Sequence, residues 1–213
     1  MELMVMTTPD KFRSEIYIVI KLFENGLNTL HLKKPKFSKS HFKNYINQIP
    51  KEYHNRIIIH QFFSLVYKYE LKGFNSSKKN KPSRIFISFT KKFKKKIVST
   101  ISCHSISQLK SLKISNYDFI LAGPLYKNAE ELKTLNSKFN DDKIKEIIFS
   151  YPKKIAFYGG ISAENLISLK NNHLYGLIIQ GAIWYSKNQQ PLDVFLEYNK
   201  RLNNNSLHAE KNN

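Results

Sequence analysis

Short apolar runs rich in β-branched side chains alternate along the chain with stretches whose apolar residues have helical spacing. The third run contains the adjacent isoleucines Ile57, Ile58 and Ile59, a pattern typical of a parallel strand buried on both faces. The alternation predicts an α/β fold with parallel strands. Eight strands are expected, at residues 3–7, 29–33, 56–60, 73–75, 97–102, 117–122, 154–158 and 175–179.

Turn and cap residues divide these runs from the expected helices. Gly26 is a C-cap, Ser38, Ser105 and Ser162 are N-caps, and Pro191 is a good first helical residue. The helices are expected at residues 15–25, 38–49, 62–71, 106–114, 141–150 and 163–171 and from 191 onward.

Eight strands that alternate with seven helices in about 200 residues fit the inventory of a single (β/α)8 TIM barrel. A doubly wound sheet would favour a glycine-rich phosphate turn after the first strand, where this chain has Thr7-Thr8-Pro9. We therefore predict one barrel over residues 1–203, followed by a polar and disordered tail over residues 204–213.

Composition agrees with a globular domain, since 41% of the 213 residues are hydrophobic and 13% are aromatic. The net charge of +19 comes from lysines spread along the whole chain. The densest cluster, at residues 91–96, belongs to no nucleic-acid motif, so a nucleic-acid partner is not favoured. No apolar run is long enough for a membrane helix, Glu2 does not suit a signal peptide, and Cys103 is the only cysteine. We expect a cytoplasmic protein that has no membrane partner.

Two glycine-containing segments follow the last two expected strands, Gly159-Gly160 and Gln180-Gly181. In a (β/α)8 barrel, this position commonly binds phosphate. Glycines there allow a phosphate to approach backbone N–H groups that a Cβ would obstruct. The alternative is that the glycines only make tight turns.

Other polar residues end the second, third and fifth strands, and they should meet on the same rim. The histidines could transfer protons near neutral pH, and a lysine suits a second phosphate. Each could instead be structural, as a solvated lysine, a packed core histidine or a helix-capping residue. We find no carboxylate pair or metal-ligand spacing among them. The candidates are His31, His60 and His104 for catalysis, and Lys33, Gln61 and Ser102 for substrate binding.

Five segments in register resemble the thiamine phosphate synthase/TenI family over residues 3–202. They are LHLKKP at 30–35, SCHS at 102–105, DFILAGPLY at 118–126, AFYGGI at 156–161 and QGAIW at 180–184. The resemblance implies a TIM barrel and a role in thiamine biosynthesis or salvage. The synthases couple a pyrimidine methyl diphosphate to a thiazole phosphate with magnesium and release pyrophosphate, which makes them transferases.

The resemblance also implies roles for individual residues. Lys33 would replace a diphosphate-binding arginine, and Ser102 would match a serine that contacts the diphosphate. His31 stands where synthases have a pyrimidine-binding glutamine. The thiazole phosphate would be held by Gly160, Gln180 and Gly181.

The chain departs from the family where the diphosphate and magnesium would bind. His60-Gln61 replaces an Asn-Asp pair whose aspartate binds magnesium, and residues 76–80 lack the second magnesium aspartate. After Gly123-Pro124, residues 128–131 read Asn-Ala-Glu-Glu instead of Thr-x-Thr-Lys, so two carboxylates stand where the anion needs a cation. TenI tautomerases place a histidine at the position of Pro124.

We therefore expect magnesium-dependent synthesis to be weak or absent. The alternative function is a catalytically degenerate protein that binds a phosphorylated thiazole or a similar small molecule. The sequence leaves open whether the chain forms a homodimer.

Overall fold

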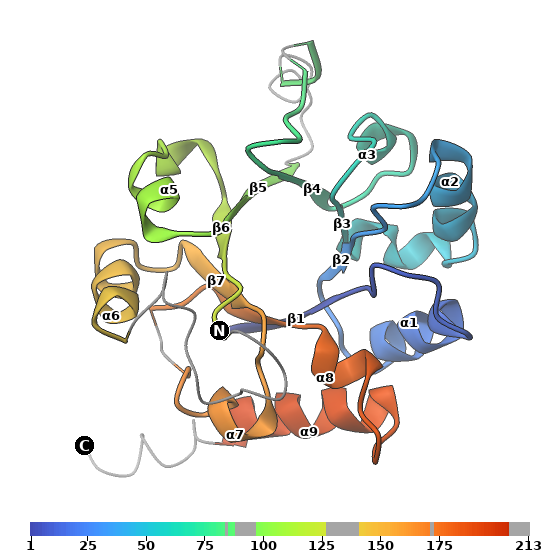
Figure 1. The fold of residues 1–213 in the computed structure, drawn as a ribbon. Coiled ribbons are helices and arrows are strands. Elements are labelled where there is room, and N and C mark those ends of the chain that lie inside the picture. Colours follow the sequence, from blue (N-terminus) through green and yellow to red (C-terminus); the bar gives the residue numbers. More distant parts are fainter. Residues whose placement is uncertain (84, 88–96, 127–140, 171–172, 205–213) are drawn as a thin grey trace.

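The computed structural model of the chain describes residues 1–83, 85–87, 97–126, 141–170 and 173–204. Eight parallel strands close into a barrel in chain order, with β8 hydrogen-bonded beside β1 (Figure 1). The predicted (β/α)8 barrel is confirmed. The strands are β1 Glu2–Met6, β2 Leu30–Leu32, β3 Ile57–Ile59, β4 Gly73–Ser76, β5 Val98–Cys103, β6 Phe119–Ala122, β7 Ile155–Tyr158 and β8 Gly176–Ile179.

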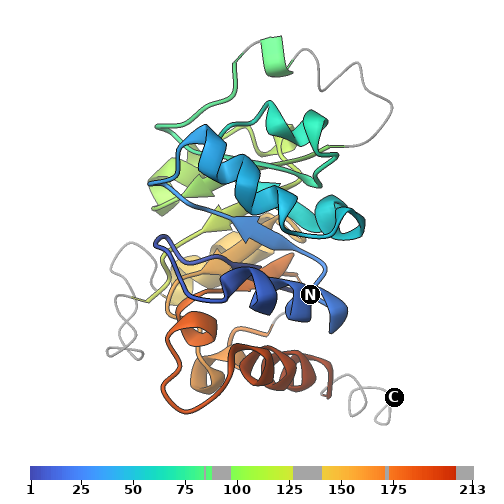
Figure 2. The ribbon, with the colours of Figure 1, turned by 90° about the vertical axis from the view of Figure 1, so that its right-hand side faces the viewer.

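Helices surround the ring of strands, and α7, α8 and α9 gather on one side of it (Figure 1). The side view in Figure 2 shows α9 as a long helix across the end of the molecule beside α7 and α8. No helix in the described ranges is both long and apolar enough to cross a bilayer. The helices are α1 Glu15–Glu24, α2 Lys39–Asn47, α3 Leu65–Lys68, α5 Ile106–Lys110, α6 Asp141–Ser150, α7 Ala163–Leu166, α8 Gly181–Trp184 and α9 Pro191–Asn204, with 3-10 turns η1 Lys51–Arg56 and η2 Ile114–Asn116.

The strands are buried on both of their faces, and in β3 both faces are apolar. Ile57 and Ile59 belong to the layer between strands and helices, whereas Ile58 belongs to the cluster inside the barrel. All three are fully buried. Strand geometry explains this division, because successive side chains point to opposite faces. The barrel interior is filled by Met4, Met6, Ile58, Phe119, Leu121, Ala156 and Ile178.

The predicted caps of α2 and α5 are confirmed. The Ser38 hydroxyl accepts a hydrogen bond from the His41 amide at 3.2 Å, and the Ser105 hydroxyl accepts one from the Gln108 amide at 3.3 Å. Several helices are shorter than predicted, most clearly α3, whereas α6 has the predicted bounds. Phe62 and Glu70 have φ of 54° and 52°, so both ends of that segment leave helical geometry.

Two further differences concern the end of the chain. α7 ends at Leu166, not at residue 171 as predicted, and α8 was not predicted at all. α8 has only four residues, too few for a periodic pattern to appear in the sequence. The lysine cluster at residues 91–96 and residues 205–213 of the predicted tail lie outside the described residues; Asn204 is the last residue of α9.

A buried ion pair fixes the segment between β1 and α1. The Lys34 ammonium lies 2.5 Å from a carboxylate oxygen of Glu15, and both side chains are almost completely buried. Lys34 also donates to the Asp10 carbonyl at 2.7 Å and to the Thr8 hydroxyl at 3.3 Å. The second oxygen of Glu15 accepts from the Thr8 amide at 3.1 Å. The carboxyl ends of β1 and β2 are therefore joined around a satisfied charge pair.

Candidate functional site

A cavity of about 700 Å³ opens at the carboxyl ends of β7 and β8, where the sequence predicts phosphate binding. All four residues predicted there, Gly159, Gly160, Gln180 and Gly181, line it. They come together because neighbouring parallel strands end at the same edge of the barrel. Side chains of α9 complete the wall, among them Glu197, Tyr198 and Arg201.

Gly159 and Gly160 are required by the backbone. Their φ values are +88° and +69°, which L side chains rarely adopt. A Cβ on Gly159 would lie 2.5 Å from the Pro124 Cβ, and one on Gly160 would lie 2.5 Å from the Tyr126 Cβ. The turn after β7 therefore packs tightly against the segment that follows β6. For Gly159 and Gly160, a tight turn alone would explain the glycines.

Gly181 differs from these two glycines. It is exposed, its φ is not positive, and a Cβ there would meet nothing within 4 Å. Neither packing nor conformation demands a glycine at this position, yet it faces the cavity. Among the described residues, the amide N–H groups of Gly160 and Gly181 have no hydrogen-bond acceptor. The cavity thus has two backbone N–H groups at its wall that can donate to a ligand.

The amide nitrogen of Gln180 is already engaged. It donates to the Thr7 carbonyl at 2.6 Å, and the indole N–H of Trp184 donates to the Met6 carbonyl at 2.7 Å. These bonds tie α8 to the end of β1. The side-chain N–H group of Gln180 therefore joins the ends of β8 and β1.

Arg201 supplies a cation that the sequence did not reveal. Its guanidinium lies 2.6 Å from the Glu197 carboxylate and donates to the Ala163 carbonyl at 3.3 Å. Glu164 also lines the cavity, and the nearby Ser162 side chain lowers the pKa of its carboxyl. No local pattern marks Arg201, because α9 reaches the cavity only through tertiary packing.

Two predicted histidines meet inside the barrel. The Nδ1 atom of His31 lies 3.1 Å from the Nε2 atom of His60. Desolvation lowers the pKa of His31 to about 3 and holds the pKa of His60 well below its usual range. Both rings are therefore neutral near pH 7. Ser102, also predicted, joins the same group through Asn75, whose amide nitrogen lies 2.8 Å from the Ser102 hydroxyl.

Lys33 and Gln61 lie on the rim with other partners. The amide N–H of Lys33 donates to the Thr7 hydroxyl at 3.0 Å, and desolvation lowers the pKa of its ammonium. Gln61 donates from its side chain to the Lys34 carbonyl at 2.8 Å. The substrate-binding roles expected of both residues stay predictions.

His104 is exposed at the end of β5 and contacts the rim on the β7 side. Its Nδ1 atom lies 2.8 Å from the Tyr158 hydroxyl and 3.1 Å from the Gly123 carbonyl oxygen. The Tyr158 hydroxyl donates to the same carbonyl at 2.8 Å, and burial raises the pKa of that phenol. Sequence reasoning missed Tyr158, because it is the last residue of an apolar strand. The neighbouring Cys103 is buried, and desolvation raises the pKa of its thiol to about 12.

The side chains at the magnesium positions of the family do not fit the ion. Gln61 is hydrogen-bonded to a carbonyl, His60 is bonded through both ring nitrogens, and Asn80 donates to the His60 carbonyl at 2.8 Å. In the described part of the chain, no three His, Cys, Asp or Glu side chains gather closely enough to hold a metal. Glu130 and Glu131 lie outside the described residues.

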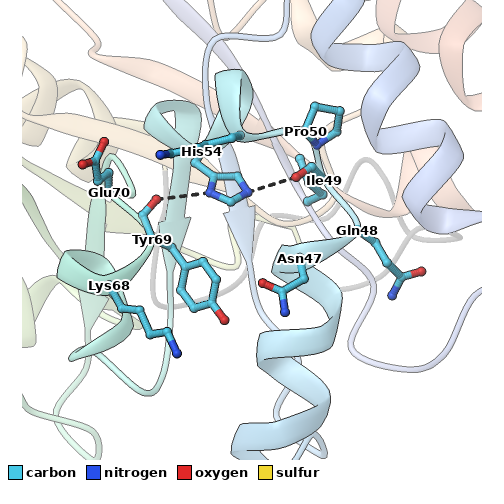
Figure 3. A pocket seen from close by; sticks show the side chains of 9 residues that line it. Asn47, Gln48, Ile49, Pro50, His54, Lys68, Tyr69 and Glu70 are labelled. Atoms are coloured by element: carbon cyan, nitrogen blue, oxygen red, sulfur yellow. Dashed lines mark hydrogen bonds between the residues drawn. The ribbon is translucent and has the colours of Figure 1, made fainter.

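A separate pocket of about 480 Å³ surrounds His54 (Figure 3). The His54 ring points between two backbone segments, with Nε2 3.0 Å from the Ile49 carbonyl oxygen and Nδ1 3.2 Å from that of Tyr69. These segments lead into β3 and β4, so the pocket lies at the amino end of the barrel. Residues there stabilise a barrel and do not form its active site.

Comparison with known proteins gives structural relatives. No protein-family model matches the chain, and neither does any curated protein. A thiamine phosphate pyrophosphorylase from Bacteroides thetaiotaomicron is 28% identical, with a TM-score of 0.72 over 94% of this chain and 97% of that chain. One from Pyrococcus furiosus has a TM-score of 0.76 at 12% identity, over 95% of this chain and 96% of that chain.

A 3-hexulose-6-phosphate synthase shares only the fold, at 12% identity and a TM-score of 0.63 over 95% of this chain and 100% of that chain. The similarity to the Bacteroides protein spans nearly the whole of both chains. The predicted resemblance to the thiamine phosphate synthase/TenI family is therefore supported by solved structures that this chain is similar to over nearly its whole length.

Proposed function

We propose that the chain binds a phosphorylated thiazole in the cavity between β7, β8 and α9, as part of thiamine biosynthesis or salvage. The observation that carries the proposal is the pair of available amide donors, Gly160 and Gly181, on one cavity of about 700 Å³. Backbone N–H groups at such turns suit a phosphate. The volume is sufficient for a small heterocyclic phosphate.

Coupling of the thiazole phosphate to the pyrimidine diphosphate, a transferase reaction, is the fuller form of this proposal. A catalytically degenerate binding protein is the second candidate. It is favoured by the lack of carboxylates at both magnesium positions of the family within the described residues. We expect weak or no magnesium-dependent synthesis. The cytoplasm stays the predicted compartment.

Calorimetric titration tests the binding claim directly. Thiazole phosphate and pyrimidine methyl diphosphate are titrated separately into the full chain, with inorganic phosphate as a third titrant. The proposal expects saturable binding of thiazole phosphate that is tighter than that of inorganic phosphate. Lack of thiazole phosphate binding would refute both candidate functions.

A steady-state assay with both substrates and magnesium separates the two candidates. Release of pyrophosphate at about 1 per second, an ordinary enzyme rate, would show a working synthase and contradict the degenerate reading. Binding of thiazole phosphate without turnover would support the binding protein.

A further inference from the structure

A continuous series of hydrogen bonds crosses four neighbouring strands inside the barrel. His31 of β2 contacts His60 after β3, and His60 Nδ1 lies 3.1 Å from the amide nitrogen of Asn75 on β4. The same nitrogen donates to Ser102 of β5 at 2.8 Å. Asn75 is 3% exposed, and it is the one member of this group that lies between both histidines and the serine.

The orientation of the Asn75 amide follows from its other neighbour, Thr100. The Thr100 hydroxyl has one proton to donate. It lies 2.8 Å from Asn75 Oδ1 and 3.2 Å from the Phe74 carbonyl oxygen, so the shorter contact takes the proton. The amide oxygen is thereby occupied, and the two N–H bonds of the amide nitrogen point to His60 and Ser102.

This orientation determines where each histidine carries its proton. His60 Nδ1 must accept from Asn75, so in the neutral ring the proton is on Nε2. That N–H group donates to His31 Nδ1, so the His31 proton must also be on Nε2. His31 Nε2 is buried and has no hydrogen-bond partner in the described part of the chain. At the other end, Ser102 accepts from Asn75 and keeps its own hydroxyl proton to donate.

We propose that Asn75 is a positioning residue that sets the proton direction along this series, so that both of its ends are hydrogen-bond donors. The half-buried Ser102 then offers an O–H group at the rim, and His31 offers an N–H group in the interior. A group that binds at the mouth of the barrel next to Ser102 must bring an acceptor, such as an anionic oxygen. The proton placement itself does not depend on which substrate the protein takes.

Long-range ¹H–¹⁵N NMR spectra of the imidazole rings at pH 8 test the proposal in the ligand-free chain. The wild type should show His31 and His60 as neutral rings protonated on Nε2. Asn75→Asp replaces the donor with a carboxylate that only accepts, so His60 should gain a proton on Nδ1. Ser102→Ala removes the other partner of the amide nitrogen and should leave both rings as in the wild type.

A second variant keeps the test decisive if Asn75→Asp does not fold. Thr100→Val removes the hydroxyl that orients the amide and should give His60 a mixture of Nδ1 and Nε2 protonation. A wild-type His60 protonated on Nδ1 would overturn the proposal. So would a His60 ring that stays on Nε2 alone in the folded Asn75→Asp or Thr100→Val variant.

Discussion

At the scale of single residues, Gly160 and Gly181 of the cavity differ in what requires a glycine. Gly160 has a backbone that only glycine adopts readily, and it touches Tyr126, whereas Gly181 has an ordinary backbone and open space around it. The sequence shows both as a glycine after a strand and does not distinguish them. The difference comes from φ and from contacts across the rim.

Substitution at these two glycines should therefore have opposite effects. Gly181→Val should leave the melting temperature close to that of the wild type, because its side chain extends into the cavity. It should weaken thiazole phosphate binding by about tenfold or more, which is about 1.4 kcal/mol. Calorimetry and thermal unfolding of the same preparation measure both quantities.

Gly160→Ala serves as the matched comparison. It forces an L side chain into a left-handed backbone and against Tyr126, so it should lower the free energy of unfolding by about 1–3 kcal/mol. Wild-type affinity in Gly181→Val would contradict the placement of the ligand.

At the scale of elements, short-range signals fix where helices begin. Ser38→Ala should destabilise the protein by about 1 kcal/mol, since the hydroxyl caps α2 through the His41 amide. Ser40→Ala, an exposed site within the same helix, is the control and should be neutral or slightly stabilising. Urea unfolding measures the free energy of unfolding of both variants. An equal decrease in the two would show that the cap contributes nothing to stability.

The buried pair of Lys34 and Glu15 holds α1 to the end of β2. Glu15→Ala leaves a buried ammonium without its counter-charge and should cost about 3–5 kcal/mol in the free energy of unfolding. Lys36→Ala breaks the neighbouring but exposed pair with Asp10 and should change stability little. A Glu15→Ala variant as stable as Lys36→Ala would contradict the structural role of the buried pair.

The eight strands and the starts of most helices could be predicted from the sequence, because burial on both faces and cap residues leave local patterns. The lengths of α3 and α7 and the existence of α8 could not be predicted. Residues with a left-handed backbone and a helix of four residues leave no local pattern in the sequence. Within the site, strand-end residues such as Gly160 and His60 were found by position. Asn75 and Arg201 were missed because only the closed barrel and the docking of α9 bring them to their partners.

At the scale of the whole molecule, the interior histidines make stability depend on pH. The folded state holds the pKa of His31 near 3 and that of His60 below its usual range, while the unfolded chain takes up protons near 6.5. The two neutral histidines therefore contribute fully to the free energy of unfolding above pH 6.5. This contribution is lost as the pH falls toward their pKa values in the folded state. Between pH 6.5 and 5, the free energy of unfolding should fall by up to about 1.4 kcal/mol per pH unit for each histidine.

Urea unfolding at pH 7.5, 6.5 and 5.5 measures this slope. The double variant His31→Gln/His60→Gln should show a shallower one, because the unfolded chain then gains two fewer protons. Identical slopes in the wild type and the double variant would show that the interior histidines titrate normally.

A crystal structure of the chain with thiazole phosphate would show directly where the ligand binds. We expect the phosphate in the cavity between β7, β8 and α9, within hydrogen-bonding distance of the amide nitrogens of Gly160 and Gly181. A bound thiazole phosphate whose phosphate lies elsewhere on the barrel, away from both glycines, would contradict this expectation.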